Sequence, residues 1–313
     1  MKGFFVKFWG TRGSIPTPGW QTRKFGGNTP CIEVRVDDAV YICDGGSGLR
    51  ELGVELVQRS NSPIVAHLFF SHSHWDHIQG FPFFIPVYRP DSSLFVYGTV
   101  EGDTRIYQLL SGQMHSDYFP VEFKDLGAKI VPEFLSEQGR VIDGVKVSWF
   151  GQVHPGSSLA YRFEHDGCRV VYATDNEIDM TIENQQESEA DPSVPRRVSA
   201  GYLDFIRHAD LLIADGQYSD EEYRTKRGWG HPRATTVVDA AIQAGVKRLA
   251  VFHHDPMMGD KSVDELIEVC CKRAEAQRSD IVIFGAREQV EMRLDEPART
   301  HTPETTRIPN FKG

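Results

Sequence analysis

The sequence predicts one α/β domain, and three observations support that fold class. Short apolar runs of the kind that form buried strands alternate along the chain with longer stretches of helical periodicity. No segment rich in proline, glycine and serine divides the chain into blocks of different composition, so no domain boundary is indicated. The 313 residues are 40% hydrophobic and 25% charged, which is typical of a globular protein with a sizeable core.

Strands are expected where a short apolar run lies between turn residues. The run Ile64–Phe70 is continuously apolar, as in strands that are covered on both faces. Two acidic residues at 37–38 separate two such runs and predict a hairpin. The other strands are expected at 4–9, 31–36, 39–43, 94–97, 129–132, 145–150, 159–163, 169–173, 211–214, 248–253 and 281–284, and helices at 49–59, 104–112, 200–208, 235–244 and 263–276.

Two segments depart from this alternation. Residues 179–199 are polar, first acidic and then basic, and contain Pro192 and Pro195, so an inserted loop is expected there. The last residues, 295–313, contain several Pro and Thr and little periodic apolar character. We therefore expect a single domain over residues 1–294, followed by a tail that wraps the surface or is poorly ordered.

Charge and cysteine content argue against several classes of protein. The net charge of −10 disfavours a protein that binds nucleic acid mainly by neutralising phosphates, although it leaves room for a small anionic substrate in a local pocket. The five cysteines include no CxxC pair, so neither a zinc ribbon nor a disulfide framework is predicted, and Cys31 and Cys43 are expected to be buried free thiols. No segment is long enough for a transmembrane helix and the apolar start is too short for a signal peptide, which makes a cytoplasmic protein the expectation.

The string SHSHWDH at 71–77 carries the main chemical signal. His72 and His74 are two residues apart, so in an extended chain both side chains point to the same side. Asp76 and His77 follow where the chain leaves the strand. Four ligands within six residues, at the carboxyl end of a buried strand, can build two adjacent metal sites. Imidazoles with one carboxylate suit zinc, and also manganese or iron.

Three further ligand-type residues follow predicted strands. His154 comes after the strand at 145–150, Asp175 after the strand at 169–173, and His253 closes the strand at 248–253. Ligands gathered at the ends of several strands are the expected arrangement for an enzyme site on a rigid sheet.

The order H-x-H-x-D-H, His, Asp, His resembles that of the metallo-β-lactamase superfamily. This resemblance implies an αββα four-layer sandwich, in which two mixed β-sheets lie face to face between outer helices. It also implies two divalent ions, with His72, His74 and His154 on one, Asp76, His77 and His253 on the other, and Asp175 bridging them.

Other motifs narrow the resemblance. The segments WGTRGSIPTP (9–18), GGNTPC (26–31) and CDGGSG (43–48) are similar to the phosphodiesterase branch, which includes ribonuclease Z and cyclic-nucleotide phosphodiesterases. In that branch a histidine at the place of His231 is not a ligand but acts as a general acid. An imidazole there can give a proton to a departing alkoxide, and Asp215 could orient it. Asp76 is expected both to bind metal and to orient the nucleophile.

The preferred function is hydrolysis of a small cyclic phosphodiester, most of all a 3′,5′-cyclic nucleotide, by a hydroxide that bridges the two metals. A ribonuclease Z-like RNA 3′-end endonuclease is the first alternative, disfavoured by the net charge and by the lack of a long Gly/Pro-rich arm. An ester, thioester or lactone hydrolase would not need His231, and a binding protein without activity would have lost ligands. A homodimer is allowed by the fold but not required by any residue.

Overall fold

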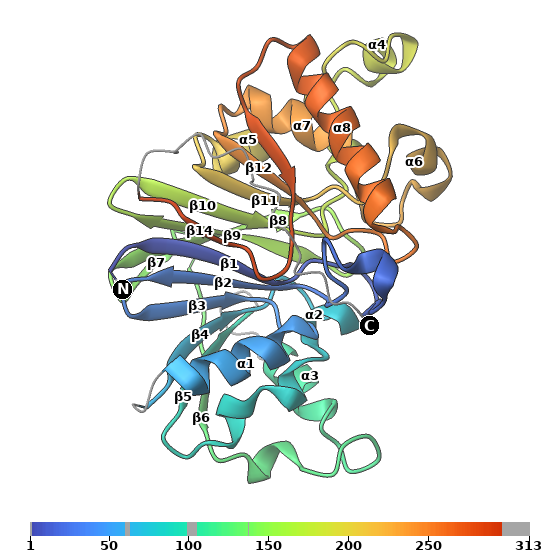
Figure 1. The fold of residues 1–313 in the computed structure, drawn as a ribbon. Coiled ribbons are helices and arrows are strands. Elements are labelled where there is room, and N and C mark those ends of the chain that lie inside the picture. Colours follow the sequence, from blue (N-terminus) through green and yellow to red (C-terminus); the bar gives the residue numbers. More distant parts are fainter. Residues whose placement is uncertain (1, 60–62, 99–104, 137, 296–313) are drawn as a thin grey trace, which may run out of the picture.

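Two seven-stranded β-sheets pack face to face and helices cover their outer faces (Figure 1). The computed structural model describes residues 2–59, 63–98, 105–136 and 138–295. The four-layer αββα sandwich predicted from the family resemblance is therefore confirmed. The part of the tail from 296 onwards lies outside the described residues.

The first sheet has the strand order β14-β1-β2-β3-β4-β5-β6. Its strands are β1 (Phe4–Gly10), β2 (Cys31–Val36), β3 (Ala39–Cys43), β4 (Val65–Phe69), β5 (Ser93–Tyr97), β6 (Lys129–Pro132) and β14 (Glu291–Arg293). Strands β2 and β3 are antiparallel, with Val36 paired to Ala39, so the hairpin expected at 37–38 is present. Strands β3 to β6 are parallel.

The second sheet has the order β13-β12-β11-β10-β9-β8-β7. Its strands are β7 (Arg140–Ile142), β8 (Val145–Gln152), β9 (Ser158–His165), β10 (Cys168–Ala173), β11 (Leu211–Asp215), β12 (Arg248–Phe252) and β13 (Val282–Gly285). Strands β10 to β13 are parallel, and β8 runs in the same direction because it is antiparallel to β9, which is antiparallel to β10. The carboxyl ends of five strands therefore lie at one edge of this sheet.

Helices cover both outer faces, with α1 and α3 on the first sheet and α5, α7 and α8 on the second (Figure 1). The helices are α1 (Gly48–Arg59), α2 (Trp75–Ile78), α3 (Arg105–Gly112), α4 (Gln185–Ala190), α5 (Ala200–Ile206), α6 (Asp220–Lys226), α7 (Ala234–Gln243) and α8 (Asp260–Ala276), and the 3₁₀ turns are η1 (Trp20–Thr22), η2 (Phe81–Phe83), η3 (Ile85–Tyr88), η4 (Phe123–Asp125) and η5 (Ile178–Thr181). None of the described helices is long and apolar enough to cross a membrane.

Aromatic side chains from both sheets fill the space between them. Phe69 of the first sheet meets Phe163 of the second edge to face, with ring centroids 5.4 Å apart, and Tyr41 contacts both rings. Burying each such ring contributes about 1.5–3 kcal/mol. This packed layer fixes the two sheets relative to each other, and so fixes the strand ends that carry the polar residues.

The segment 179–199 is more structured than its polar composition suggested. It contains η5 and α4, and Asp179 is buried, where it accepts hydrogen bonds from the side chains of Arg233 (2.7 Å) and Thr236 (2.7 Å). Polar residues are buried here because they find charged and hydroxyl partners in the helix layer. That the segment is an insertion into the fold stays a prediction.

Candidate metal centre

The predicted ligands converge at one edge of the sandwich, where strands of both sheets end. His72 follows β4 in the first sheet, and His154, Asp175 and His253 follow β8, β10 and β12 in the second. His74 has an extended backbone, and its ring centroid lies 4.5 Å from that of His72, so the two side chains lie together as the two-residue spacing predicts. The single turn α2 then changes the direction of the chain.

The seven residues form two groups, and Asp175, a member of the first, also lies close to histidines of the second. The first group is His72, His74, His154 and Asp175, and the second is Asp76, His77 and His253. Within each group the potential ligand atoms lie within 4.8 Å of one another. Oδ2 of Asp175 lies 3.7 Å from Nε2 of both His72 and His154. Oδ1 lies 3.3 Å from Nε2 of both His77 and His253. Each oxygen of this carboxylate thus faces one group, which is the arrangement a bridging ligand needs.

Four of the histidines have Nδ1 engaged away from the centre. His77 Nδ1 lies 2.7 Å from Asp44 and His253 Nδ1 lies 2.9 Å from Oε1 of Gln217. His154 Nδ1 lies 2.9 Å from the carbonyl of Gly230, and His72 Nδ1 lies 3.0 Å from Oγ of Ser71. Acceptors at Nδ1 hold the proton there and leave Nε2 as the free donor atom, as in known metal-binding histidines.

The polar atoms at the centre fit divalent cations. Nε2 of His72 and of His77 are buried and make no hydrogen bond within the described residues, although Nε2 of His77 lies close to the carboxylates of Asp76 (3.2 Å) and Asp175 (3.3 Å). A buried, unpartnered imidazole nitrogen is unfavourable unless something binds it. Burial raises the pKa of Asp175, but the nearby His253 and His77 outweigh that effect and hold its pKa well below the ordinary value. The carboxylate is therefore ionised and available as a ligand.

Three residues at the strand ends adopt left-handed backbone conformations. Asp44, Asp175 and His253 have φ angles of 60°, 47° and 60°. Each such residue costs about 1–3 kcal/mol and persists only where its surroundings hold it. The side chains of Asp44 and His253 are held by the hydrogen bonds given above. The strained backbone therefore occurs at residues whose side chains lie in or against the ligand cluster.

His231 lies beside the cluster and is paired with Asp215. Its Nδ1 is 2.7 Å from Oδ2 of Asp215, which sits at the end of β11 and is fully buried. The His231 ring stacks on that of His253 at 5.0 Å between centroids. Ligand-type atoms of His231 and Asp215 also lie within 4.8 Å of those of Asp175 and His253, so these four residues form a further group that could hold a metal ion. The contact of Nδ1 with Asp215 leaves Nε2 of His231 open, as a proton donor requires, and the role of His231 as the acid stays a prediction.

The charge of His231 depends on Asp215. Burial lowers the pKa of His231, but the charge of Asp215 and its hydrogen bond outweigh burial and raise the pKa to about 9. A raised pKa means that the imidazolium is the main form at neutral pH and is lost as the pH rises through about 9. If His231 is the acid, activity should fall along the same basic limb.

Replacing Asp215 with asparagine should move that basic limb to lower pH. The substitution removes the main effect that raises the His231 pKa while keeping the shape of the side chain, and burial, which lowers this pKa, remains. The measurement is kcat/KM against pH for both proteins. An unchanged limb in Asp215→Asn would contradict the assigned pairing.

Several further residues support the predicted ligands. Asp44 contacts His77 and also accepts hydrogen bonds from the backbone N–H of Ser71 (2.7 Å) and the hydroxyl of Tyr172 (2.6 Å). Gln217, the carbonyl of Gly230 and Glu177 carried no local signal, because single polar residues in loops are common. Their roles depend on which loops the fold brings together.

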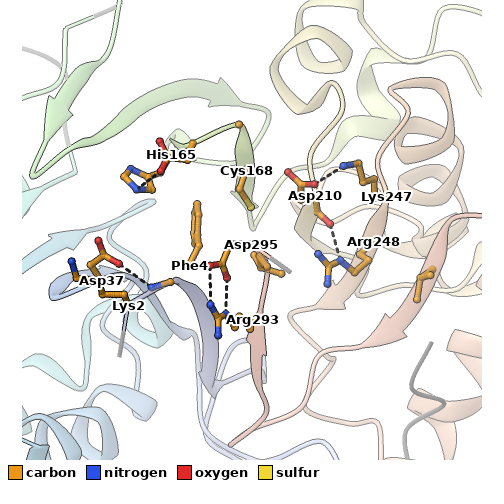
Figure 2. A pocket seen from close by; sticks show the side chains of 15 residues that line it. Lys2, Phe4, Asp37, His165, Cys168, Asp210, Lys247, Arg248, Arg293 and Asp295 are labelled. Atoms are coloured by element: carbon orange, nitrogen blue, oxygen red, sulfur yellow. Dashed lines mark hydrogen bonds and ion pairs between the residues drawn. The ribbon is translucent and has the colours of Figure 1, made fainter. Parts of the chain in front are cut away.

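A cavity of about 560 Å³ lies away from this centre (Figure 2). It is lined by residues at the amino ends of β10, β11 and β12, opposite the edge that carries the histidines. Its charged side chains pair with one another, as in Lys247 with Asp210 (2.7 Å) and Arg293 with Asp295 (2.9 Å). The candidate site is therefore assigned from the ligand geometry and not from cavity size.

Comparison with known proteins identifies the family. The model of the family described as "Beta-lactamase superfamily domain" matches residues 41–254, more than half of the chain, and the chain belongs to that superfamily. The expected class of metal-dependent hydrolase is thereby confirmed.

Individual relatives cover nearly the whole chain. Ribonuclease Z of Haloarcula marismortui is 22% identical over 325 residues, which cover 93% of this chain and 97% of that protein. Among solved structures, the metallo-β-lactamase fold protein YhfI of Bacillus subtilis has a TM-score of 0.65 at 18% identity, covering 93% of this chain and 99% of its own. The short form of human tRNase Z has a TM-score of 0.62 at 16% identity, with the same coverage.

Proposed function

We propose that this protein is a dinuclear metal-dependent phosphodiesterase that cleaves RNA near its 3′ end, in the manner of a ribonuclease Z. The observation that carries the proposal is the pair His231–Asp215 placed against a two-group ligand cluster. A hydrolase that cleaves an ester with a poor leaving group needs such a proton donor, because an alkoxide leaves slowly at neutral pH.

The chain supplies ligands for two ions. His72, His74 and His154 would hold one, Asp76, His77 and His253 the other, and Asp175 both. Zinc suits this set, in which imidazoles predominate, with manganese and iron as the other candidates. When bound, the two ions supply a nucleophilic water at neutral pH and offset the negative charge of the phosphate.

Side chains of the protein orient the attacking water and protonate the departing oxygen. Oδ2 of Asp76 accepts a hydrogen bond from the backbone N–H of Ser14 (2.7 Å) and lies 3.2 Å from Nε2 of His253, so its orientation is fixed. Such a carboxylate can orient the attacking water. His231 protonates the departing oxygen, and Asp215 holds the imidazole in position and keeps it charged.

Relatives named ribonuclease Z support RNA as the substrate better than the cyclic nucleotide preferred from the sequence. The one described above aligns over nearly its entire length, and others from Thermoplasma acidophilum and Sulfurisphaera tokodaii also match. A small cyclic phosphodiester stays as the second candidate because the net charge of −10 disfavours a protein that binds long polyanions. Assembly as a homodimer also stays a prediction.

The substrate can be tested with protein loaded with zinc or manganese. The panel is an RNA hairpin with a 3′ extension, the same hairpin without it, cyclic AMP, cyclic GMP and a carboxylic ester. We expect cleavage of the extended RNA. Turnover of the cyclic nucleotides alone would favour the second candidate, and turnover of the ester alone would overturn the assignment as a phosphodiesterase.

A further inference from the structure

Glu177 is a buried carboxylate that the proposed mechanism does not use. Its side chain, 2% exposed, lies two residues after Asp175 and accepts three hydrogen bonds from neutral donors. Oε1 accepts from the hydroxyl of Tyr223 (2.7 Å) and the backbone N–H of Gly228 (2.7 Å). Oε2 accepts from the backbone N–H of Gly230 (2.8 Å). Both oxygens are thus directed at the loop that leads into His231.

This loop touches a predicted ligand as well as the predicted acid. Gly230 has a φ of 93°, and a Cβ atom at that position would collide with the His154 ring, so only glycine allows the close approach. The Gly230 carbonyl lies 2.9 Å from Nδ1 of His154, and His231 follows directly in the chain. One residue of the loop therefore fixes His154, and the next is the proton donor.

The main chain around Glu177 holds His154 from the other side. The backbone N–H of Glu177 donates to the carbonyl of Val153 (2.8 Å), and the side-chain carbonyl of Asn176 accepts from the N–H of Val153 (3.0 Å). Three loops meet at Glu177: its own after β10, the His154 loop after β8, and the loop at 228–231. Helix α6 adds a fourth contact through Tyr223.

We propose that Glu177 is a positioning residue that sets His154 and His231 together. Through the glycine amides it fixes the Gly230 carbonyl, which holds the proton of His154 on Nδ1 and leaves Nε2 for the metal. Through the same loop it places His231 against Asp215. The effect on the metal rests on the predicted ligand set, and the effect on turnover rests on the proposed function.

Glu177→Gln is the decisive variant. Glutamine keeps the shape of the side chain, but an NH₂ group replaces one of the two accepting oxygens. This NH₂ group is itself a donor and would face an N–H or O–H donor. We expect the variant to bind one of its two zinc ions about 10–100-fold more weakly, the usual effect of losing a group that orients a ligand. The measurement is zinc competition against a chromophoric chelator, with the visible spectrum of the cobalt-substituted protein as a second readout.

Asp239→Asn provides the matched control. Asp239 is fully buried in α7 and accepts hydrogen bonds from Arg196 N (2.9 Å) and Arg273 (2.7 Å), away from the cluster. Its loss should lower stability without changing zinc affinity or the cobalt spectrum. If Glu177→Gln loses stability in the same way but keeps wild-type zinc affinity and spectrum, the proposal is overturned.

Two further outcomes are distinguishable. If Glu177→Gln yields no folded protein, Tyr223→Phe carries the test by removing one of the three donors, and unchanged zinc affinity in that variant contradicts the proposal. If the wild type binds two ions but cleaves no phosphodiester, the proposed function fails, while the zinc measurement still tests Glu177.

Discussion

Asp175→Asn is expected to abolish hydrolysis and to reduce the number of tightly held ions below two per chain. Each carboxylate oxygen of Asp175 faces one group of histidines, at 3.3 and 3.7 Å, so an amide would remove the negative charge shared by both groups. Metal ions contribute several kcal/mol of transition-state stabilisation, and about 4 kcal/mol corresponds to roughly a thousandfold in rate.

Metal content by mass spectrometry and kcat on the best substrate measure this effect. Asp210→Asn is the matched control, because Asp210 is a largely buried carboxylate at the opposite end of the same sheet and accepts from Arg169 N (2.8 Å). We expect this control to keep two ions and full activity. An Asp175→Asn protein with two ions and normal turnover would remove Asp175 from the centre.

His231→Ala is expected to lower kcat by about 10²–10⁴-fold on RNA, the usual contribution of a general acid. The loss should depend on the leaving group. A p-nitrophenyl phosphodiester releases a stable phenolate that needs no proton, so the variant should cleave it almost as well as the wild type does. Metal content should not change, because His231 is assigned no ion.

Comparing turnover of the two substrates distinguishes a general acid from a metal ligand at position 231. Equal losses on both substrates, together with a lower metal content, would show that His231 binds metal and would contradict its role as an acid. His67→Ala is the control, since His67 is also a buried histidine and bonds Asp143 (2.9 Å) in a different part of the sheet. We expect that variant to keep its turnover of both substrates.

The convergence of the seven predicted ligands was predictable because it depends on local sequence and on a general property of sheets. Four ligands stand in one string after the apolar run of β4, and the other three each follow a strand. Since parallel strands end at the same edge, adjacency of their following residues requires only the correct strand assignment. Asp215 was predictable for the same reason, because it ends β11.

The supporting contacts were not predictable because they join loops that are distant in the sequence. Glu177 bonds residues more than 50 positions away, and Gln217 bonds His253 across 36 positions. Neither residue has a local pattern that points to its partner. The helix α6 was also missed, although Ser219 and Glu222 form a reciprocal capping box, because its sequence is almost entirely polar. Strands β7 and β14 were too short to show an alternation.

Each predicted ion takes ligands from both sheets. His72 and His74 follow β4 of the first sheet and His154 follows β8 of the second. Asp76 and His77 lie in α2, after β4, and His253 follows β12 of the second sheet. A bound ion would thus crosslink segments that follow strands of the two different sheets, at one edge of the sandwich. At a free ion concentration 100 times the dissociation constant, one such ion adds about 2.7 kcal/mol to the free energy of unfolding. A chelator would then lower the free energy of unfolding by loosening the contact between the two sheets, as well as stop the chemistry.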